Sequence, residues 1–220
     1  MKQNIEPVFI TARDIPDAWY QSIRWLLQES TGSHRYKIDQ GSYAGQYRLE
    51  LDYATIQIKY PWSTPMVPDT PVGVPCPSSD DYVAQYILKL MTSQKDLNEE
   101  YTYGERIENQ IPKIIERYKA GPGNNQLVLQ IAGPPDLELA DPPCLRHIDT
   151  RILDGRLHFF PYFRSWDLWA GFPNNLAAIQ HLKKYMADMI GVEDGDIIAS
   201  SKGLHLYEYT WEMAGDTVNR

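Results

Sequence analysis

Two short segments in the second half of the chain bring together a nucleophile and an anion-binding group. Cys144 lies in Asp141-Pro142-Pro143-Cys144-Leu145, where two prolines restrict the backbone and hold the thiol in place. Arg164-Ser165 follows 20 residues later (164 − 144). An ionised cysteine is a strong nucleophile, and a guanidinium both stabilises a thiolate and binds phosphate. The pair is therefore chemically capable of covalent catalysis on a substrate that carries an anionic group.

Each of these residues has an ordinary structural explanation when it stands alone. A free cysteine is most often a small buried apolar residue, and an arginine after a strand most often forms a surface ion pair. Two further segments shift the balance toward function, namely Gly171-Phe172-Pro173-Asn174-Asn175 and Gly203-Leu204-His205-Leu206-Tyr207. An asparagine near a proline is often a helix N-cap, and a lone His-x-Tyr is usually structural. Only the four segments together favour a functional site.

These four segments, in this order and at this spacing, resemble the thymidylate synthase family. The shared pattern is a Pro-Cys nucleophile, Arg-Ser-x-Asp, Gly-x-Pro-x-Asn and then His-x-Tyr, and it extends from about Tyr101 to Tyr207. The chain is most similar to the shorter archaeal-type members. It lacks the tryptophan-bearing insertion of the longer members, and Leu145 stands where they have a histidine.

The resemblance implies a catalytic group of Cys144, Tyr103 and Arg164. Addition of the Cys144 thiolate to C6 of a pyrimidine makes C5 nucleophilic toward a one-carbon electrophile. Arg164 is expected to lower the pKa of the thiol. Tyr103, in Tyr101-Thr102-Tyr103-Gly104, matches the tyrosine whose hydrogen-bond network removes the C5 proton.

The resemblance also implies a substrate-binding set. In the family these positions contact the phosphate, the base or the sugar of the nucleotide, and here they are Arg164, Ser165, Asp167, Asn175, His205 and Tyr207. Asn175 matches the residue that reads the base. Its amide both donates to a uracil O4 and accepts from N3–H, so we expect uracil rather than cytosine. No metal ligand is implied.

Several positions depart from the family pattern. Asn124-Asn125 stands where the family has paired arginines that reach the partner subunit's phosphate. Arg35 and Arg106 are the candidates to replace them. By a rough alignment, Gln85 stands where the family has a catalytic glutamate, and an amide is neither an acid nor a base.

The expected reaction is transfer of a one-carbon unit to C5 of a uracil nucleotide, from dUMP to dTMP. The donor implied by the resemblance is 5,10-methylenetetrahydrofolate or a related methylene-tetrahydropterin of the tetrahydromethanopterin type. A pyrimidine nucleotide 5-hydroxymethylase and a non-catalytic nucleotide-binding homologue are the alternatives. The retained Cys144 argues against the second, because a pure binder has little need of a nucleophile.

Composition limits the classes of protein that are compatible with the chain. The 220 residues suit a single domain, residues 1–220, and the net charge of −8 argues against a broad nucleic-acid-binding surface. No apolar run reaches the roughly 20 residues that a membrane span needs. Two cysteines, Cys76 and Cys144, form no disulfide framework, which favours a cytoplasmic protein.

The elements that must position these residues form an α+β pattern. Helices are expected after Ile15, after Ser79, from about Ile107 and from Pro173, and strands over 127–132, 147–153, 156–163 and 196–200. Residues 47–60 form either two strands or one bent by a bulge. Pro61 to Pro77 holds six prolines and is expected to be an extended loop. The fold class is a thymidylate synthase-like mixed β-sheet with helices packed on one face.

A sheet with helices on one face leaves the other face for a partner. The strand from Leu127 to Ala132 is too apolar to face water, and a two-fold dimer buries the same patch of both chains. We therefore expect a homodimer, as in the family.

Overall fold

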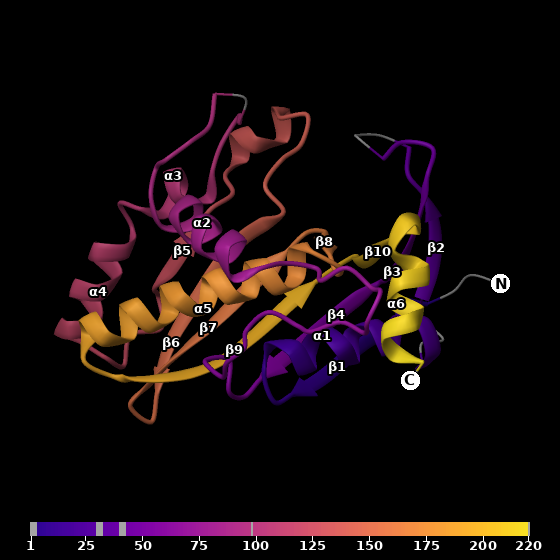
Figure 1. The fold of residues 1–220 in the computed structure, drawn as a ribbon. Coiled ribbons are helices and arrows are strands. Elements are labelled where there is room, and N and C mark those ends of the chain that lie inside the picture. The colour runs from indigo at the N-terminus through magenta and orange to yellow at the C-terminus, as the bar shows by residue number, and fades with distance from the viewer. Residues whose placement is uncertain (1–3, 30–32, 40–42, 98, 220) are drawn as a thin grey trace.

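The computed structural model describes residues 4–29, 33–39, 43–97 and 99–219. Its strands form two mixed sheets, and the smaller one lies toward one end of the molecule (Figure 1). The larger has the order β1 (Pro7–Ala12), β4 (Tyr53–Ile58), β9 (Glu193–Ser201), β7 (Arg156–Phe163), β6 (Leu145–Leu153) and β5 (Val128–Gln130). The smaller has the order β2 (Ser33–Lys37), β3 (Tyr47–Leu51), β10 (Leu204–Tyr207) and β8 (Trp166–Asp167). The pairs β1–β4, β7–β9 and β8–β10 are parallel, and the others are antiparallel.

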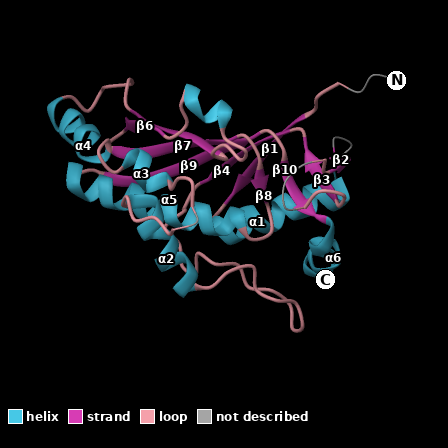
Figure 2. Ribbon diagram, turned by 90° about the horizontal axis from the view of Figure 1, so that it is seen from above, coloured by secondary structure: helices cyan, strands magenta, loops and turns pink. Residues whose placement is uncertain are grey.

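Helices cover one face of the larger sheet. They are α1 (Ile15–Arg24, followed by a π-helical turn over Trp25–Glu29), α2 (Asp80–Met91), α3 (Tyr103–Ile107), α4 (Ile111–Ala120) and α5 (Gly171–Ile190). The last helix, α6 (Trp211–Val218), packs on α1 at the end of the molecule that holds the smaller sheet (Figure 1). Helices α1 and α5 lie side by side across the strands (Figure 2). The expected α+β class, with a mixed sheet and helices on one face, is confirmed. Within the described residues no helix is long and apolar enough to cross a membrane.

The same three stretches of chain run through both sheets. β3 and β4 are separated only by Asp52, β7 leads into β8 through Arg164-Ser165, and β9 leads into β10 through Lys202-Gly203. The segment 47–60 is thus two strands, and its halves belong to different sheets. Each stretch has the same neighbours in both sheets. β9 lies between β4 and β7, and β10 lies between β3 and β8, where Leu204 pairs with Leu51 and with Trp166. The two sheets therefore meet along a seam of three adjacent crossing points.

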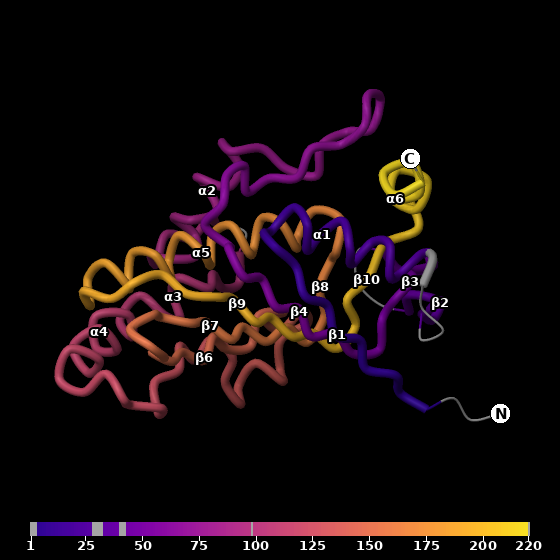
Figure 3. Tube along the Cα trace, turned by 90° about the horizontal axis from the view of Figure 1, so that it is seen from below, coloured from indigo at the N-terminus to yellow at the C-terminus, as the bar shows by residue number. Residues whose placement is uncertain are grey.

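Local sequence signals position several elements as expected. The Ser79 hydroxyl accepts from Tyr82 N at 3.2 Å and caps α2. Asp154 and Gly155 have φ values of 49° and 74°, the left-handed pair that a two-residue hairpin between β6 and β7 requires. Residues 59–79 contain no helix or strand, and this proline-rich segment passes over the helical side of the molecule (Figure 3).

Two expectations are corrected. α5 begins at Gly171 and not at Pro173, because the Asp167 carboxylate accepts from the backbone N–H groups of 169–171 and starts the helix earlier. The apolar side chains of 127–132 need no partner chain to bury them. Leu129 is fully buried within the chain, and Leu127 and Ile131 are nearly so.

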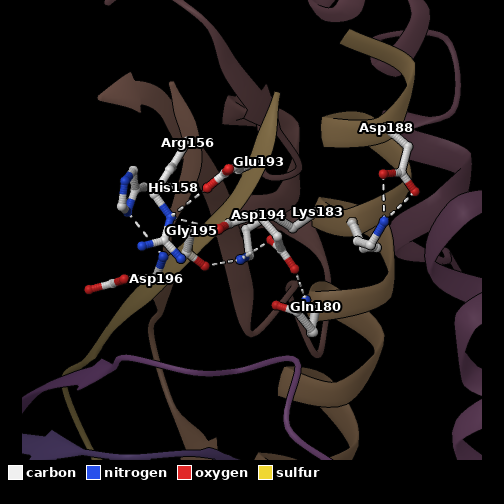
Figure 4. Close-up of polar contacts among 10 residues, drawn as sticks. Arg156, His158, Gln180, Lys183, Asp188, Glu193, Asp194, Gly195 and Asp196 are labelled. Atoms are coloured by element: carbon white, nitrogen blue, oxygen red, sulfur yellow. Dashed lines mark hydrogen bonds and ion pairs between the residues drawn. The ribbon is translucent and has the colours of Figure 1, made fainter. Parts of the chain in front are cut away.

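A lysine is buried where α5 packs on the larger sheet. The Lys183 side chain is fully buried, and its ammonium donates to the Asp194 carboxylate and to Gly195 O (Figure 4). Gln180 also donates to Asp194. The Lys183 ammonium lies 5.7 Å from the centre of the Trp62 ring, at the start of the proline-rich segment. The polar cluster thus joins α5, β9 and that segment.

Candidate active site

The Cys144 thiol lies at the edge of a pocket beside the seam between the sheets. β6 begins at the next residue, and Cys144 O accepts from Arg164 N at 2.8 Å, so the two residues are held together by the backbone. The pocket has a volume of about 390 Å³, and its walls include Cys144, Arg164, Ser165, Tyr207 and Arg48. The fold thus gathers four of the sequence-predicted side chains from three distant segments.

The charged neighbours of Cys144 shift the pKa of its thiol in opposite directions. Burial raises the pKa of the Cys144 thiol, the Arg164 guanidinium lowers it, and the Asp141 carboxylate raises it again. Arg164 Nη2 lies 2.7 Å from Asp141 Oδ1, and Arg164 Nε donates to Pro142 O at 3.1 Å. Arg164 therefore acts on the thiol with the expected sign. The net pKa of the thiol nevertheless lies above its ordinary value, because burial outweighs the guanidinium.

Tyr103 adjoins the nucleophile through the backbone. Its hydroxyl accepts from Leu145 N, the residue after Cys144, at 3.3 Å. Burial raises the pKa of Tyr103, so its phenol is protonated at neutral pH. The next residue must be glycine, because a Cβ at Gly104 would lie 1.9 Å from Thr92 O at the end of α2. That close approach fixes Tyr103 against the helix.

Asn175 lies between two aromatic side chains. Trp166 Nε1 donates to Asn175 Oδ1 at 2.9 Å, and Asn175 Nδ2 donates to Tyr86 OH at 2.6 Å. Tyr86 is half-buried, desolvation raises its pKa, and Cys144 and Tyr103 act on it electrostatically. The base-reading candidate is therefore linked to the surroundings of the nucleophile. Asp167 is engaged with the start of α5, and burial raises its pKa against three backbone hydrogen bonds.

His205 and Tyr207 lie two residues apart on β10. His205 is 2 % exposed, and burial lowers its pKa to about 4, so the ring is neutral at pH 7. Its Nδ1 lies 2.9 Å from Gly203 O, which only accepts, so Nδ1 carries the proton. Its Nε2 is then a bare acceptor that has no hydrogen-bond partner among the described residues. The Tyr207 ring stacks on Tyr43 with centroids 4.3 Å apart.

Comparison with known proteins agrees with this geometry. The family model described as thymidylate synthase matches residues 77–220. The chain belongs to the thymidylate synthase family. A protein of Methanosarcina barkeri named "Putative thymidylate synthase" is 26% identical over 216 residues, which cover 95% of this chain and 94% of that protein. Its counterpart in Methanosarcina acetivorans is 27% identical over the same coverage. The thymidylate synthase of Listeria monocytogenes is 31% identical over 118 residues, 53% of this chain and 37% of that enzyme. Membership implies a nucleotide substrate and a donor of the methylene-tetrahydrofolate type.

The candidate phosphate residues of this thymidylate synthase family member lie apart from the Cys144 pocket. Arg106 pairs with Asp136 at 2.9 Å. Arg35 lies over the Tyr47 ring at 4.0 Å, and its guanidinium lies 3.5 Å from Glu208. Neither arginine lines the pocket that holds Cys144.

Sequence reasoning missed Arg48, which does line that pocket. Arg48 pairs with Tyr207 across β3 and β10, and its Nη2 lies 2.7 Å from Glu50. A second pocket of about 410 Å³ along the seam is lined by Arg48, Arg164, Ser165 and Lys202. Only the pairing of β3 with β10, over 150 residues apart, reveals Arg48, and no local motif marks it.

On α2 the residue that contacts the site is Tyr86, and not the expected Gln85. Gln85, aligned with the family glutamate, is exposed on α2. Tyr86 is the α2 residue that reaches Asn175. A helix turns about 100° per residue, so a one-residue uncertainty in a rough alignment decides which side chain faces the site.

Proposed function

We propose that this chain transfers a one-carbon unit from a methylene-tetrahydropterin to C5 of a uracil nucleotide, dUMP, through a covalent Cys144 adduct. The observation that carries the proposal is the shared pocket. A nucleophilic thiol, two arginines and the Tyr207 hydroxyl line one cavity of about 390 Å³. That combination supplies a nucleophile, an anion site and a sugar contact within reach of one nucleotide.

The thiol begins the reaction by adding to the base. Cys144 Sγ loses its proton and bonds to C6, and the electron pair of the C5–C6 double bond moves toward O4. C5 then bonds to the one-carbon unit and gives up its proton, and the bond from that carbon to the pterin nitrogen breaks with its electron pair going to nitrogen. A hydride from the pterin, or water in a hydroxymethylase, adds to that carbon while the C5–C6 double bond re-forms and the S–C6 bond breaks with its electron pair returning to sulfur. Because burial raises the thiol pKa, Arg164 is the group that compensates the negative sulfur.

Phosphate and sugar have separate sites in this proposal. Arg48, Arg164 and Ser165 face the cavities at the seam and supply charge-assisted hydrogen bonds to a phosphate. Asp141 is 84% exposed, so an incoming dianion competes with it for Arg164. The bare Nε2 of His205 is suited to accept a hydrogen bond from a sugar hydroxyl, with Tyr207 beside it at a centroid distance of 4.7 Å.

A third pocket is suited to the pterin ring of the donor. It has a volume of about 190 Å³ and is lined by Tyr86, Tyr101 and Tyr103 with Lys89, Glu99 and Thr102. Aromatic walls stack on a planar heterocycle, and the polar groups match its amide edges. Tyr103, which lines this pocket, accepts from Leu145 N, the residue after Cys144, so this pocket adjoins the nucleophile. When bound, the pterin supplies the one-carbon unit and, for a methyl product, a hydride.

We also propose a homodimer that buries the uncovered face of the larger sheet. Phe9 on β1 is 62% exposed, and side chains of Tyr53, Phe160, Tyr162 and Ile198 are half-exposed on the same face, opposite α1 and α5. Apolar area of this kind is normally buried by a partner. Sedimentation at low protein concentration tests it, and a stable monomer contradicts it.

Release of tritium from [5-³H]dUMP in the presence of methylenetetrahydrofolate tests the reaction. The wild-type protein should release tritium, and mass spectrometry should find a 5-methyl product, whereas a 5-hydroxymethyl product would identify the hydroxymethylase. Cys144→Ser should abolish the release, with Cys76→Ser as the matched control because Cys76 is exposed and remote from the pocket. Full release by Cys144→Ser would refute the covalent mechanism.

A further inference from the structure

The amide of Asn175 is held in one orientation by its neighbours. An indole N–H only donates, so the atom that faces Trp166 Nε1 at 2.9 Å is the oxygen Oδ1. The Tyr86 hydroxyl both donates and accepts, so it tolerates either end of the amide and adds no preference of its own. Trp166 is therefore the neighbour that decides which end of Asn175 points where.

The indole that makes this choice is rigid. Trp166 is 2% exposed. Its ring stacks on Phe163 with centroids 3.9 Å apart and packs tilted against Phe172 at 4.5 Å. Its backbone is fixed as well, because β8 pairs with β10 and Trp166 N donates to Gly203 O at 3.1 Å. A turned amide would place Nδ2–H against the indole N–H and leave two donors facing each other.

Asn175 remains open to a ligand despite these contacts. It is the one half-buried residue in the otherwise buried run from Phe172 to Gln180. Two hydrogen bonds leave one Nδ2 hydrogen and one Oδ1 lone pair unused. Uracil presents an acceptor at O4 and a donor at N3, and cytosine presents the reverse pair. A turned amide therefore matches cytosine instead of uracil.

We propose that Trp166 is a specificity-determining positioning residue, whose indole N–H fixes the Asn175 amide in the orientation that accepts uracil and rejects cytosine. The inference rests on the proposed function of this site. Trp166 touches no substrate in this account and acts only through Asn175.

Replacement of the donor tests the inference. Trp166→Phe keeps an aromatic ring between Phe163 and Phe172 and removes only the N–H and part of the ring. The measured quantity is the ratio of dissociation constants for dCMP and dUMP, determined by calorimetry. The ratio should fall at least about tenfold in Trp166→Phe, because the amide then turns freely. Trp169→Phe is the matched control, since its ring packs on Trp19 at 5.2 Å in the same core.

A second variant separates orientation from general loss of affinity. Tyr86→Phe should weaken both nucleotides by similar factors and leave their ratio unchanged within about twofold, because the Trp166 contact still orients the amide. A variant that fails to fold does not end the test, since the wild-type protein itself reports the orientation. NMR should detect scalar coupling across the hydrogen bond from Trp166 ¹⁵Nε1 to Asn175 ¹³Cγ.

The outcomes distinguish this inference from the proposed function. If the wild-type protein prefers dUMP and Trp166→Phe keeps the same ratio, the inference is overturned and the function stands. Absence of the coupling in the wild-type protein also overturns it. If the wild-type protein binds neither nucleotide, the proposed function fails and the inference fails with it.

Discussion

Lys183→Met is expected to destabilise the fold far more than the same change one residue later. Lys183 is fully buried and pairs with Asp194, whose side chain is 11% exposed. Methionine is close in length to lysine, so packing is largely kept while the charge is lost. The Asp194 carboxylate then remains buried with the Gln180 amide as its neutral donor.

The magnitude follows from the cost of an unpaired buried charge. Removal of one partner of a buried ion pair costs about 3–5 kcal/mol, and we expect about 3 kcal/mol here. Lys183→Met combined with Asp194→Asn should recover at least about 2 kcal/mol, because no buried charge is left and an amide oxygen still accepts from Gln180. Lys184→Met is the control. Its pair with Asp188 has side chains 53% and 60% exposed, so its loss should cost at most about 0.5 kcal/mol.

The same pair gives the free energy of unfolding a pH dependence. Burial lowers the pKa of Lys183 from 10.5 to about 8, with Asp194 opposing the shift. Between these two values the unfolded chain binds more protons, so stability rises as the pH rises from about 8 toward 10.5. The rise attributable to Lys183 is at most about 3 kcal/mol, and the double variant should lack it.

Guanidinium unfolding at about pH 7 and about pH 9.5, at one fixed protein concentration, measures both effects. If Lys183→Met and Lys184→Met shift the unfolding free energy equally, the reasoning about the buried pair is refuted. The pH argument is refuted separately if the wild-type protein and the double variant show the same pH dependence above pH 8.

Three further predictions concern the site. Asp141→Asn should lower the pKa of Cys144, because the carboxylate raises it, and an unchanged pH profile of iodoacetamide alkylation would contradict this. Arg48→Ala should weaken dUMP binding by at least about tenfold and deoxyuridine binding little, since only the nucleotide carries the anion. An equal effect in the control Arg35→Ala, whose guanidinium lies by Glu208, would contradict it. NMR should find His205 neutral down to about pH 5, because burial lowers its pKa to about 4, and a titration midpoint near 6.5 would refute that burial.

The elements that sequence predicted well are those specified by neighbouring residues. The Asp154-Gly155 hairpin needs only two residues that tolerate positive φ, and the α2 cap needs only Ser79 and Tyr82 N. The sequence leaves open whether the chain breaks into two strands at Asp52. Alternation of apolar and polar residues shows which side chains share a face and not which strands pair with one another. Likewise the burial of Lys183 has no signal in an apolar pattern, since it depends on a carboxylate on β9.

The same distinction holds for the site. Cys144, Arg164 and Ser165 form motifs with fixed spacing, and they line one pocket. Trp166 occupies the unspecified position of Arg-Ser-x-Asp, so the motif gives it no role, although it contacts Asn175. Arg35 is a candidate for phosphate binding on its charge alone, and charge does not show where a strand places a side chain.

The seam between the sheets brings three basic side chains together on an acidic chain. Three neighbouring stretches leave the larger sheet at Asp52, Arg164-Ser165 and Lys202-Gly203, and these residues line the same cavity of about 410 Å³. The backbones stay hydrogen-bonded to one another across the junction, where Gly203 N donates to Leu51 O at 3.2 Å and Trp166 N donates to Gly203 O at 3.1 Å. The approach there is close, since a Cβ at Gly203, which has φ of 74°, would lie 3.0 Å from the Glu50 carboxyl carbon. The cavity thus gathers three cations, Arg48, Arg164 and Lys202, against the two carboxylates of Glu50 and Asp52, although the whole chain has a net charge of −8. Local potential follows this geometry and not the overall composition.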